Sequence, residues 1–336
     1  MNIAFTICSN NYLARAKVVA DTFILKHPEN KFFFFLVDKI DPNLNYESLT
    51  NYQLIEIGKV VPDIEELAKK YNIIELNTAV KPSVFLYLFN LFHDATVIYL
   101  DPDLMIFDRF TEVEEGLKND NINVIVTPHF CSPIDDGKYP SEIDFALYGL
   151  YNLGFIAIKN SEESQRFLLW WHERLKKYCY MRPQEGMFTD QLWVNYAPLF
   201  FNGVFVLKDL GYNVANWNLY ERVITKEEDA FFINRQYKLK FFHFSHYQFN
   251  DPYILSKYQN RHYIKDLPDV KALIDIYQAA LIQNKQNDFS KSPCYYVKLY
   301  QSHQAQVKAQ EDLVYYTFKR KVINKITGLL NHIIPD

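Results

Sequence analysis

The sequence predicts an α/β protein built around a mostly parallel sheet, and two observations support this prediction. Through the first half of the 336-residue chain, short apolar runs alternate with segments whose apolar residues recur at helical spacing. That order is expected when helices cross over between parallel strands. Hydrophobic residues make up 49% of the chain, enough to form a sizeable core in one large domain or two smaller ones.

The elements are expected in the following order. Pro28 ends the first helix, Pro82 stands in the first turn of another, and Ser161 is a plausible helix cap. Strands are predicted at residues 3–8, 32–37, 55–57, 97–100, 124–127, 154–158 and 241–246. Helices are predicted at residues 12–25, 63–71, 79–92, 161–179 and 191–196, and again from about residue 268 onward.

Bulk composition excludes several classes of protein. The net charge is -4 and the pI about 6.2, so nothing indicates bulk nucleic-acid binding. The four cysteines are scattered without a CxxC pair, which argues against a structural zinc site or a disulfide framework. The first residues lack the basic region of a signal peptide, and no uncharged run approaches the roughly 18 apolar residues of a membrane span. We therefore expect a cytoplasmic enzyme.

Asp101 and Asp103 are the most informative residues of the chain. They follow the apolar run 97–100 and precede a second apolar run. On an extended backbone alternate residues share a face, so the two carboxylates can point the same way at the end of a strand. Two oxygen ligands so placed suit a hard divalent cation that keeps positions open for a substrate phosphate. The alternative is a β-turn with two solvated aspartates, for which Asp-Pro-Asp is also suited.

The turn at residues 8–12 is expected at the same edge of the sheet as these carboxylates. It follows the first strand, and in parallel sheets ligands bind beyond the carboxyl ends of the strands. The sequence thus predicts a nucleotide diphosphate site made by this turn and the two aspartates.

Six segments in order resemble the GT-A glycosyltransferases, most closely the retaining kind typified by glycogenin and the bacterial lipooligosaccharide galactosyltransferases. They are the strand and turn at 3–12, the basic segment 79–83, the metal motif 99–103, Tyr151-Asn152-Leu153-Gly154-Phe155, residues 188–195 with Asp190-Gln191, and Phe242-His243-Phe244-Ser245. The likeness covers about residues 1–262. Residues 211–219 also resemble bacterial polysaccharide and O-antigen relatives of this group.

This resemblance implies a Rossmann-like GT-A catalytic domain over residues 1–265 and a helical C-terminal extension over 266–336. It implies a donor site with Mn²⁺, or Mg²⁺, held by Asp101, Asp103 and His243; the mixed oxygen and nitrogen ligands favour Mn²⁺. The implied donor contacts are Ile7, Cys8, Asn11, Tyr12, Lys81, Asp101 and Asn152. The implied catalytic residues are Asp190 and Gln191, with Gln191 nearest the anomeric carbon. The expected reaction moves a sugar from a nucleotide sugar, UDP-sugar favoured, to a glycan or lipid-linked acceptor with retention, in bacterial surface polysaccharide synthesis.

Three positions depart from the pattern of the group. Leu192 replaces its second acidic residue, and Lys81 replaces the more usual arginine, which keeps the charge but loses the bidentate fork. The first turn has Cys8-Ser9-Asn10 where an aspartate for the base is often found, so the identity of the base stays open.

Simpler readings of the same residues stay open beside this one. His243 suits a core histidine, His246 competes with it as a ligand, and Asp190 suits a helix cap. Asn152 and Gly154 suit a plain strand entry with a close backbone approach. The basic stretch near the C-terminus suits either a solvated helix face or an interfacial helix on anionic lipid.

The alternatives for the whole chain are a nucleotidyltransferase of similar fold and a non-catalytic nucleotide-sugar-binding module. A nucleotidyltransferase is expected to carry a glycine-rich, basic loop after its first strand, which Ser9-Asn10-Asn11 does not provide. An aspartyl phosphatase also uses two such carboxylates, but Leu104-Met105-Ile106 does not continue its motif.

Overall fold

A seven-stranded sheet forms the centre of the computed structural model, which describes residues 2–333. Its strand order is β10-β6-β7-β4-β1-β2-β3, and every neighbouring pair is parallel except the two pairs made by β7. The strands are β1 Asn2–Cys8, β2 Lys31–Leu36, β3 Gln53–Glu56, β4 Thr96–Leu100, β6 Val124–Pro128, β7 Tyr151–Lys159 and β10 Val204–Val206. The predicted α/β class with a mostly parallel sheet is confirmed.

Helices cover both faces of this sheet, which is why its inner strands are largely apolar. In β2, Phe33 and Phe35 face the core under α4 Lys81–Leu91 and α7 Glu162–Tyr178, while Phe32 and Phe34 face α1 Leu13–Lys26. All four rings are buried. A strand buried on both sides shows a continuous apolar run instead of alternation.

A second, smaller unit lies against the α1 side of the sheet. Its three-stranded sheet has the order β11-β15-β5, and a separate antiparallel sheet has the order β12-β13-β14. These strands are β5 Leu104–Ile106, β11 Val214–Ala215, β12 Ile224–Glu227, β13 Ala230–Ile233, β14 Tyr237–Lys238 and β15 Phe241–His243. The helix α10 Pro268–Gln283 buries Leu273, Tyr277 and Leu281 in the same core.

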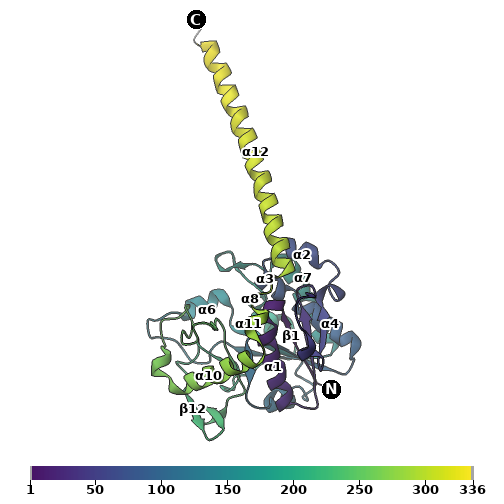
Figure 1. The fold of residues 1–336 in the computed structure, drawn as a ribbon, viewed down its shortest axis with the longest axis vertical. Helices are drawn as coiled ribbons and strands as arrows, with labels where there is room; N and C mark the ends of the chain where they lie inside the picture. Colours follow the sequence, from purple (N-terminus) through teal and green to yellow (C-terminus); the bar gives the residue numbers. More distant parts are fainter. Residues whose placement is uncertain (1, 334–336) are drawn as a thin grey trace.

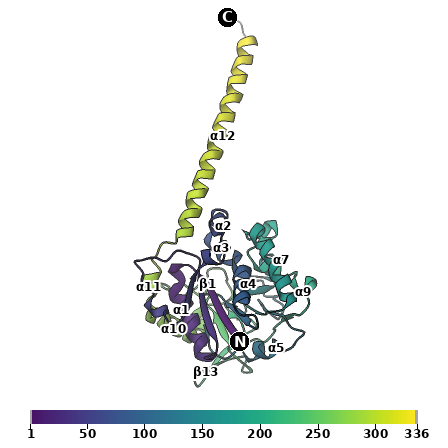
Figure 2. The ribbon, with the colours of Figure 1, turned by 90° about the vertical axis from the view of Figure 1, so that its right-hand side faces the viewer.

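The remaining elements are short, apart from the last helix. They are α2 Ile64–Lys70, α3 Ile73–Ala79, α5 Thr111–Gly116, α6 Glu142–Tyr148, β8 Met181–Arg182, β9 Met187–Phe188, α8 Gln191–Val194, α9 Ala197–Phe200, α11 Gln286–Phe289 and α12 Tyr295–Ile333. Figures 1 and 2 show α12 leaving the body beside α2 and extending away from it. The division into a catalytic domain over residues 1–265 and a C-terminal extension over 266–336 stays a prediction. Residue 1 of the first part and residues 334–336 of the second lie outside the described residues.

The caps explain where two of the helices begin. The Ser161 hydroxyl accepts the Ser164 amide at 3.1 Å and starts α7, as the sequence predicts. Asn72 and Glu75 form a reciprocal capping box that starts α3, a separate helix ahead of the predicted one at 79–92. This box places a helix directly before Lys81, which begins α4.

Candidate metal centre

Asp101 and Asp103 lie in a tight connection between β4 and β5, at the carboxyl end of β4. The backbone turns at Pro102 and Asp103, so this turn, and not strand alternation, brings the two carboxylates together. Their side chains keep 27% and 17% of their surface exposed. A ligand can therefore reach both carboxylates, unlike the fully buried residues of β4 beneath them.

His243 reaches the same place from far along the chain. It ends β15, which pairs antiparallel with β5 so that His243 stands opposite Leu104, next to Asp103. Its Nε2 lies 3.1 Å from Asp103 Oδ1 and 3.8 Å from Asp101 Oδ2. One ligand atom from each of the three residues lies within 4.8 Å of the others. His246 is instead exposed and packs its ring against Tyr258.

Gly154 leaves the room that this cluster needs. Because β7 is antiparallel to β4, its beginning lies at the carboxyl end of β4, and the Asp101 amide donates to Gly154 O at 2.8 Å. A Cβ on Gly154 would lie 2.6 Å from His243 Cε1 and 2.9 Å from Asp101 Oδ2. The absence of a side chain at this position is thus a requirement of the cluster.

Asn213 fixes the orientation of the imidazole. Its Oδ1 lies 3.3 Å from His243 Nδ1, so a proton on Nδ1 leaves the Nε2 lone pair facing the carboxylates. Its Nδ2 donates to Asn152 Oδ1 at 3.0 Å and to Thr127 Oγ1 at 2.9 Å. Asn213 is completely buried with a φ of 52°, a left-handed conformation that asparagine tolerates well.

Lys81 and Asp190 form a buried ion pair beside the cluster. Lys81 Nζ lies 2.6 Å from Asp190 Oδ2 and 3.8 Å from Asp101 Oδ1, and it donates to Leu153 O at 2.9 Å. The ammonium also sits over the Tyr99 ring, 4.2 Å from its centroid. Thr189, directly before Asp190, is buried with a φ of 45°, so the backbone that presents this carboxylate is held in an uncommon conformation.

The charges of these groups perturb one another strongly. Burial raises the pKa of Asp101, more than the nearby Lys81 and His243 lower it. Burial alone would raise the pKa of Asp103 as well, but the charge and hydrogen bond of His243, together with the charges of Arg15 and His246, lower the value. Asp103 in turn raises the pKa of His243 against the effect of burial. The cluster therefore favours a positive charge between the two carboxylates.

The residues fit a divalent cation. Three carboxylates, from Asp101, Asp103 and Asp190, lie near the Lys81 ammonium and the His243 imidazole, and the charge of Arg15 also acts on Asp103. Two carboxylate oxygens and one imidazole nitrogen form a ligand set suited to Mn²⁺, which accepts both donor types. The Tyr99 hydroxyl donates to Asp101 Oδ1 at 2.5 Å and so leaves Oδ2 toward His243.

The turn at residues 8–12, after β1, lies at the same edge of the sheet as Asp101 and Asp103. Some of its side chains are buried in the core and others lie at the surface. Ile7 and Cys8 are buried in the cores on opposite faces of β1, so only their backbone atoms remain for a ligand. Residues Asn10–Tyr12 form a single 3-10 turn, in which Asn11 is half-buried and Tyr12 is exposed. The roles predicted for these residues stay predictions.

Asn152 and Gln191 already have protein partners. Asn152 Oδ1 accepts the Gly154 amide at 3.0 Å, and its Nδ2 lies 3.2 Å from His129 Nε2. The Gln191 amide nitrogen donates to Tyr148 O at 2.7 Å. Gln191 also packs against Gly149, where an added Cβ would lie 3.3 Å from it. This bond uses one N–H of Gln191, so its oxygen and its second N–H remain for a sugar, and that contact stays a prediction.

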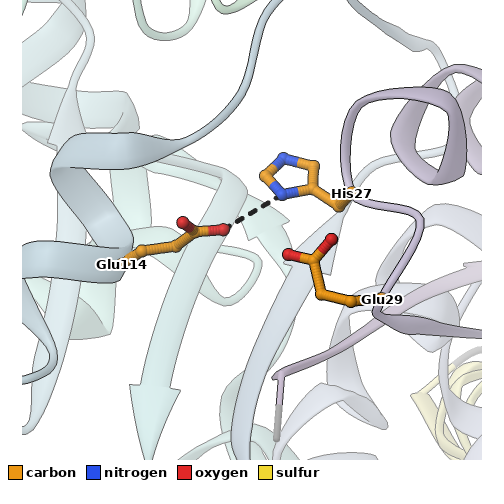
Figure 3. Close-up of side chains that lie close together, drawn as sticks. All are labelled: His27, Glu29 and Glu114. Carbon is orange, nitrogen blue, oxygen red and sulfur yellow. Dashed lines mark hydrogen bonds and ion pairs between the residues drawn. The ribbon is translucent and has the colours of Figure 1, made fainter.

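A second group of His, Glu and Glu residues provides a contrast. His27, Glu29 and Glu114 also bring one ligand atom each within 4.8 Å, and Figure 3 shows His27 bonded to Glu114. Arg109 Nη2, however, donates to Glu29 and lies 2.8 Å from Glu114 Oε1. The Phe110 amide donates to His27 Nε2 at 3.3 Å. These partners already satisfy the group, and we interpret it as a structural ion-pair cluster.

The sequence offered weak signals for the residues that support the cluster. Asn213 lies in the segment 211–219, which only the family resemblance marks as notable. Its neighbours in the sequence do not predict its contact with His243. Tyr99 reads as one more apolar strand residue. Gly154 gave the clearer signal, since a glycine inside a strand often marks a close approach.

Comparisons with known proteins find distant relatives. A scan of family models found no match for this chain. It is 28% identical over 156 residues to the uncharacterized protein YfnF of Bacillus subtilis (strain 168), covering 45% of this chain and 50% of that protein. It is 25% identical over 203 residues to the uncharacterized protein YfnD of the same organism, covering 60% and 62%. The chain thus spans about half to three fifths of the length of these relatives.

The comparison with solved structures finds several glycosyltransferases, all at low sequence identity. The galactosyltransferase LgtC, in complex with donor and acceptor sugar analogues, is 16% identical with a TM-score of 0.49, over 87% of this chain and 98% of its own. The bifunctional WbbM is 13% identical with a TM-score of 0.45, over 89% and 51%. GlyE of Streptococcus pneumoniae TIGR4 is 13% identical with a TM-score of 0.45, over 88% and 66%. Each of these TM-scores is below 0.5.

Proposed function

We propose that this chain is a metal-dependent glycosyltransferase that moves a sugar from a nucleotide diphosphate sugar to a glycan or lipid-linked acceptor. The observation that supports this most is the meeting of Asp101, Asp103 and His243 within 4.8 Å at the carboxyl end of β4. UDP is the favoured donor nucleotide, and Mn²⁺ the favoured ion. The setting that we propose is the cytoplasm, in the synthesis of a bacterial surface polysaccharide.

The divalent ion, when bound, supplies a Lewis acid that stabilises negative charge on the departing diphosphate. Asp101, Asp103 and His243 would hold it, and the contact of Asn213 with His243 Nδ1 would keep Nε2 directed at it. Lys81 neutralises Asp190 and lies close to Asp101, so it lowers the negative charge that a bound diphosphate would meet. Stabilisation of the leaving group is where we expect most of the rate enhancement.

Transfer breaks the bond between the anomeric carbon and a phosphate oxygen, whose electron pair stays on the phosphate. The acceptor hydroxyl oxygen forms the new bond on the same face, and its proton passes to the departing phosphate. Asp190 and Gln191 line the reacting face of the sugar in this proposal. A front-face reaction of this kind retains the anomeric configuration and needs no strong base from the protein.

The test is release of free nucleoside diphosphate from a panel of UDP- and GDP-sugars with Mn²⁺ and with a chelator. We expect slow donor hydrolysis that requires the ion and is lost in Asp103→Asn. Pyrophosphate release from a nucleoside triphosphate and a sugar phosphate would instead establish the nucleotidyltransferase alternative. Tight donor binding without turnover, even with a range of glycan acceptors, would identify a binding module and refute the proposal.

A further inference from the structure

Arg15 provides a cation near the candidate metal centre that forms no ion pair with a carboxylate in the described part of the chain. It lies in the first turn of α1, shortly after the turn at residues 8–12, and its side chain is half-buried. Arg15 Nη2 donates to Tyr247 O at 3.0 Å, and within residues 2–333 the structure gives the guanidinium no other hydrogen bond. Most of its N–H groups therefore remain for a ligand.

Two aromatic rings hold this guanidinium in place. Arg15 Cζ lies 5.2 Å from the centroid of the Tyr12 ring and 5.7 Å from that of the Tyr247 ring. Both distances are within the range of a cation–π interaction. Tyr12 belongs to the turn after β1, whereas Tyr247 follows β15, so Arg15 joins the two segments. A planar fork held in this way loses little freedom when a ligand binds it.

The segment that carries Tyr247 starts at the metal centre. The Phe244 amide donates to Asp103 O at 2.9 Å, and the Tyr247 amide donates to Phe244 O at 3.0 Å. The charge of Arg15 also acts on the Asp103 side chain: burial tends to raise the pKa of Asp103, and Arg15 helps His243 to lower it. Arg15 therefore lies near Asp103 without forming an ion pair with it.

The other charges around the site already match one another. The carboxylates of Asp101 and Asp103 balance a divalent cation, and Lys81 Nζ lies 2.6 Å from Asp190 Oδ2. The diphosphate of a nucleotide sugar adds negative charge that these groups, taken together, do not balance. Arg15 is a cation that remains available for it.

We propose that Arg15 binds the diphosphate of the donor through its free N–H groups, and this inference rests on the proposed function. The guanidinium fork matches two phosphate oxygens at once, and such charge-assisted pairs are stronger than neutral hydrogen bonds. With its bond to Tyr247 O kept, one side chain connects the donor, the turn after β1 and the segment after β15. A purely structural role, which only ties α1 to Tyr247, needs one N–H and no phosphate.

Calorimetric titration of the full chain separates the two roles. UDP and GDP are each titrated with saturating Mn²⁺, and Mn²⁺ is titrated alone. We expect Arg15→Gln to bind whichever nucleotide the parent binds roughly ten- to a hundredfold more weakly, the value of hydrogen bonds between charged groups. Mn²⁺ alone should bind at least as tightly as in the parent, because a positive charge near Asp103 has been removed. Arg15→Lys keeps the charge and should retain part of the nucleotide affinity.

Arg166→Gln is the matched control. Arg166 is exposed on α7, which follows the end of β7 at the opposite edge of the sheet, and it pairs with Glu163. Its replacement changes the net charge as much as Arg15→Gln does. Both affinities should be the same in this control as in the parent.

The outcomes for Arg15 and for the proposed function are distinguishable. Unchanged nucleotide affinity in Arg15→Gln would overturn the role of Arg15 and leave the proposed function intact. Parallel loss of Mn²⁺ and nucleotide binding in both Arg15 variants would assign a structural role and reject the inference as well. If the parent bound neither UDP nor GDP, the proposed function would fail together with it.

Discussion

The ammonium of Lys81 lies 2.6 Å from Asp190 Oδ2, and both side chains are almost completely buried. The pair thereby connects the start of α4 with the segment before α8. Lys81 is also 3.8 Å from Asp101, so one buried cation lies close to both a predicted metal-ligand carboxylate and a predicted catalytic carboxylate. The sequence resemblance implies that Lys81 contacts the donor phosphates. The structure shows in addition that Lys81 forms ion pairs with Asp190 and Asp101.

Removing one partner of this pair should destabilise the protein, because the other is left buried and unpaired. We expect Lys81→Met to lower the free energy of unfolding by about 3 kcal/mol. The double variant with Asp190→Leu should recover much of that loss. Urea unfolding of both single variants and the double variant measures the coupling. Additive losses across the cycle would contradict a direct interaction.

Divalent cations should bind at the cluster of Asp101, Asp103 and His243 and not at the cluster of His27, Glu29 and Glu114. Asp101→Asn and Asp103→Asn each remove a carboxylate ligand, and we expect each to weaken Mn²⁺ binding at least about tenfold. Glu29→Gln should leave it unchanged, since Arg109 already pairs with that cluster. Calorimetric titration of the three variants with Mn²⁺ distinguishes the clusters. Loss of binding in Glu29→Gln would reverse the assignment.

Adding a single methyl group at Gly154 should disturb the metal centre. The new Cβ would lie 2.6 Å from His243 Cε1, so the imidazole or the strand must shift. We expect Gly154→Ala to cost about 2 kcal/mol of stability and to weaken Mn²⁺ binding. Gly58→Ala is the control, because its Cβ would meet only Ile64 Cγ2 at 3.9 Å. If Gly154→Ala and Gly58→Ala had the same stability and the same Mn²⁺ affinity, the predicted clash at Gly154 would be refuted.

Asn213 should act on metal binding through its contact with His243. Asn213→Asp keeps an acceptor oxygen for His243 Nδ1, whereas Asn213→Gly tolerates the positive φ but removes that oxygen. We expect the glycine variant to bind Mn²⁺ roughly ten- to a hundredfold more weakly, and the aspartate variant to retain much of the affinity. Nitrogen-15 NMR of His243 reports the tautomer independently. An unchanged tautomer in Asn213→Gly would contradict the positioning role.

His129 should make the protein less stable in mild acid. Burial lowers its pKa from 6.5 to about 3, so on acidification the unfolded chain takes up this proton first. Stability should therefore fall as the pH drops below the unfolded value, by about 2 kcal/mol between pH 7 and pH 5 from this residue. Urea unfolding at both pH values checks it, with His129→Phe as comparison. The phenylalanine variant should lose less stability over this range, and an identical loss would contradict the assignment.

The elements that depend on local pattern could be predicted from the sequence, and those that depend on distant packing could not. The apolar run of β2 and the Ser161 cap of α7 are local features, and the structure has both. The carboxylates of Asp101 and Asp103 were also evident locally. By contrast, the antiparallel direction of β7 depends on a crossover that no local pattern records, and that direction brings Gly154 to Asp101.

The supporting residues of the site show the same limit. His243 was identified as a ligand through resemblance only, since its neighbours are those of a core histidine. Its partner Asn213 and the ion pair of Lys81 with Asp190 exist only because separate segments fold against one another. Side chains four residues apart on a helix can be predicted to meet from their spacing in the sequence. No fixed spacing predicts contacts between residues of separate segments.

The buried carboxylate of Asp38 connects the root of α12 to the turn after β1. One of its oxygens accepts the amide at the root of α12, and the other accepts the Asn10 amide at 3.3 Å, in the turn after β1. Asp38 therefore links the root of the long helix to the backbone predicted to hold the nucleotide, and a tilt of the helix would act on that backbone. By thermodynamic reciprocity, a nucleotide that fixes this turn would bias the angle of the helix, and attachment of the helix would alter nucleotide affinity by the same factor.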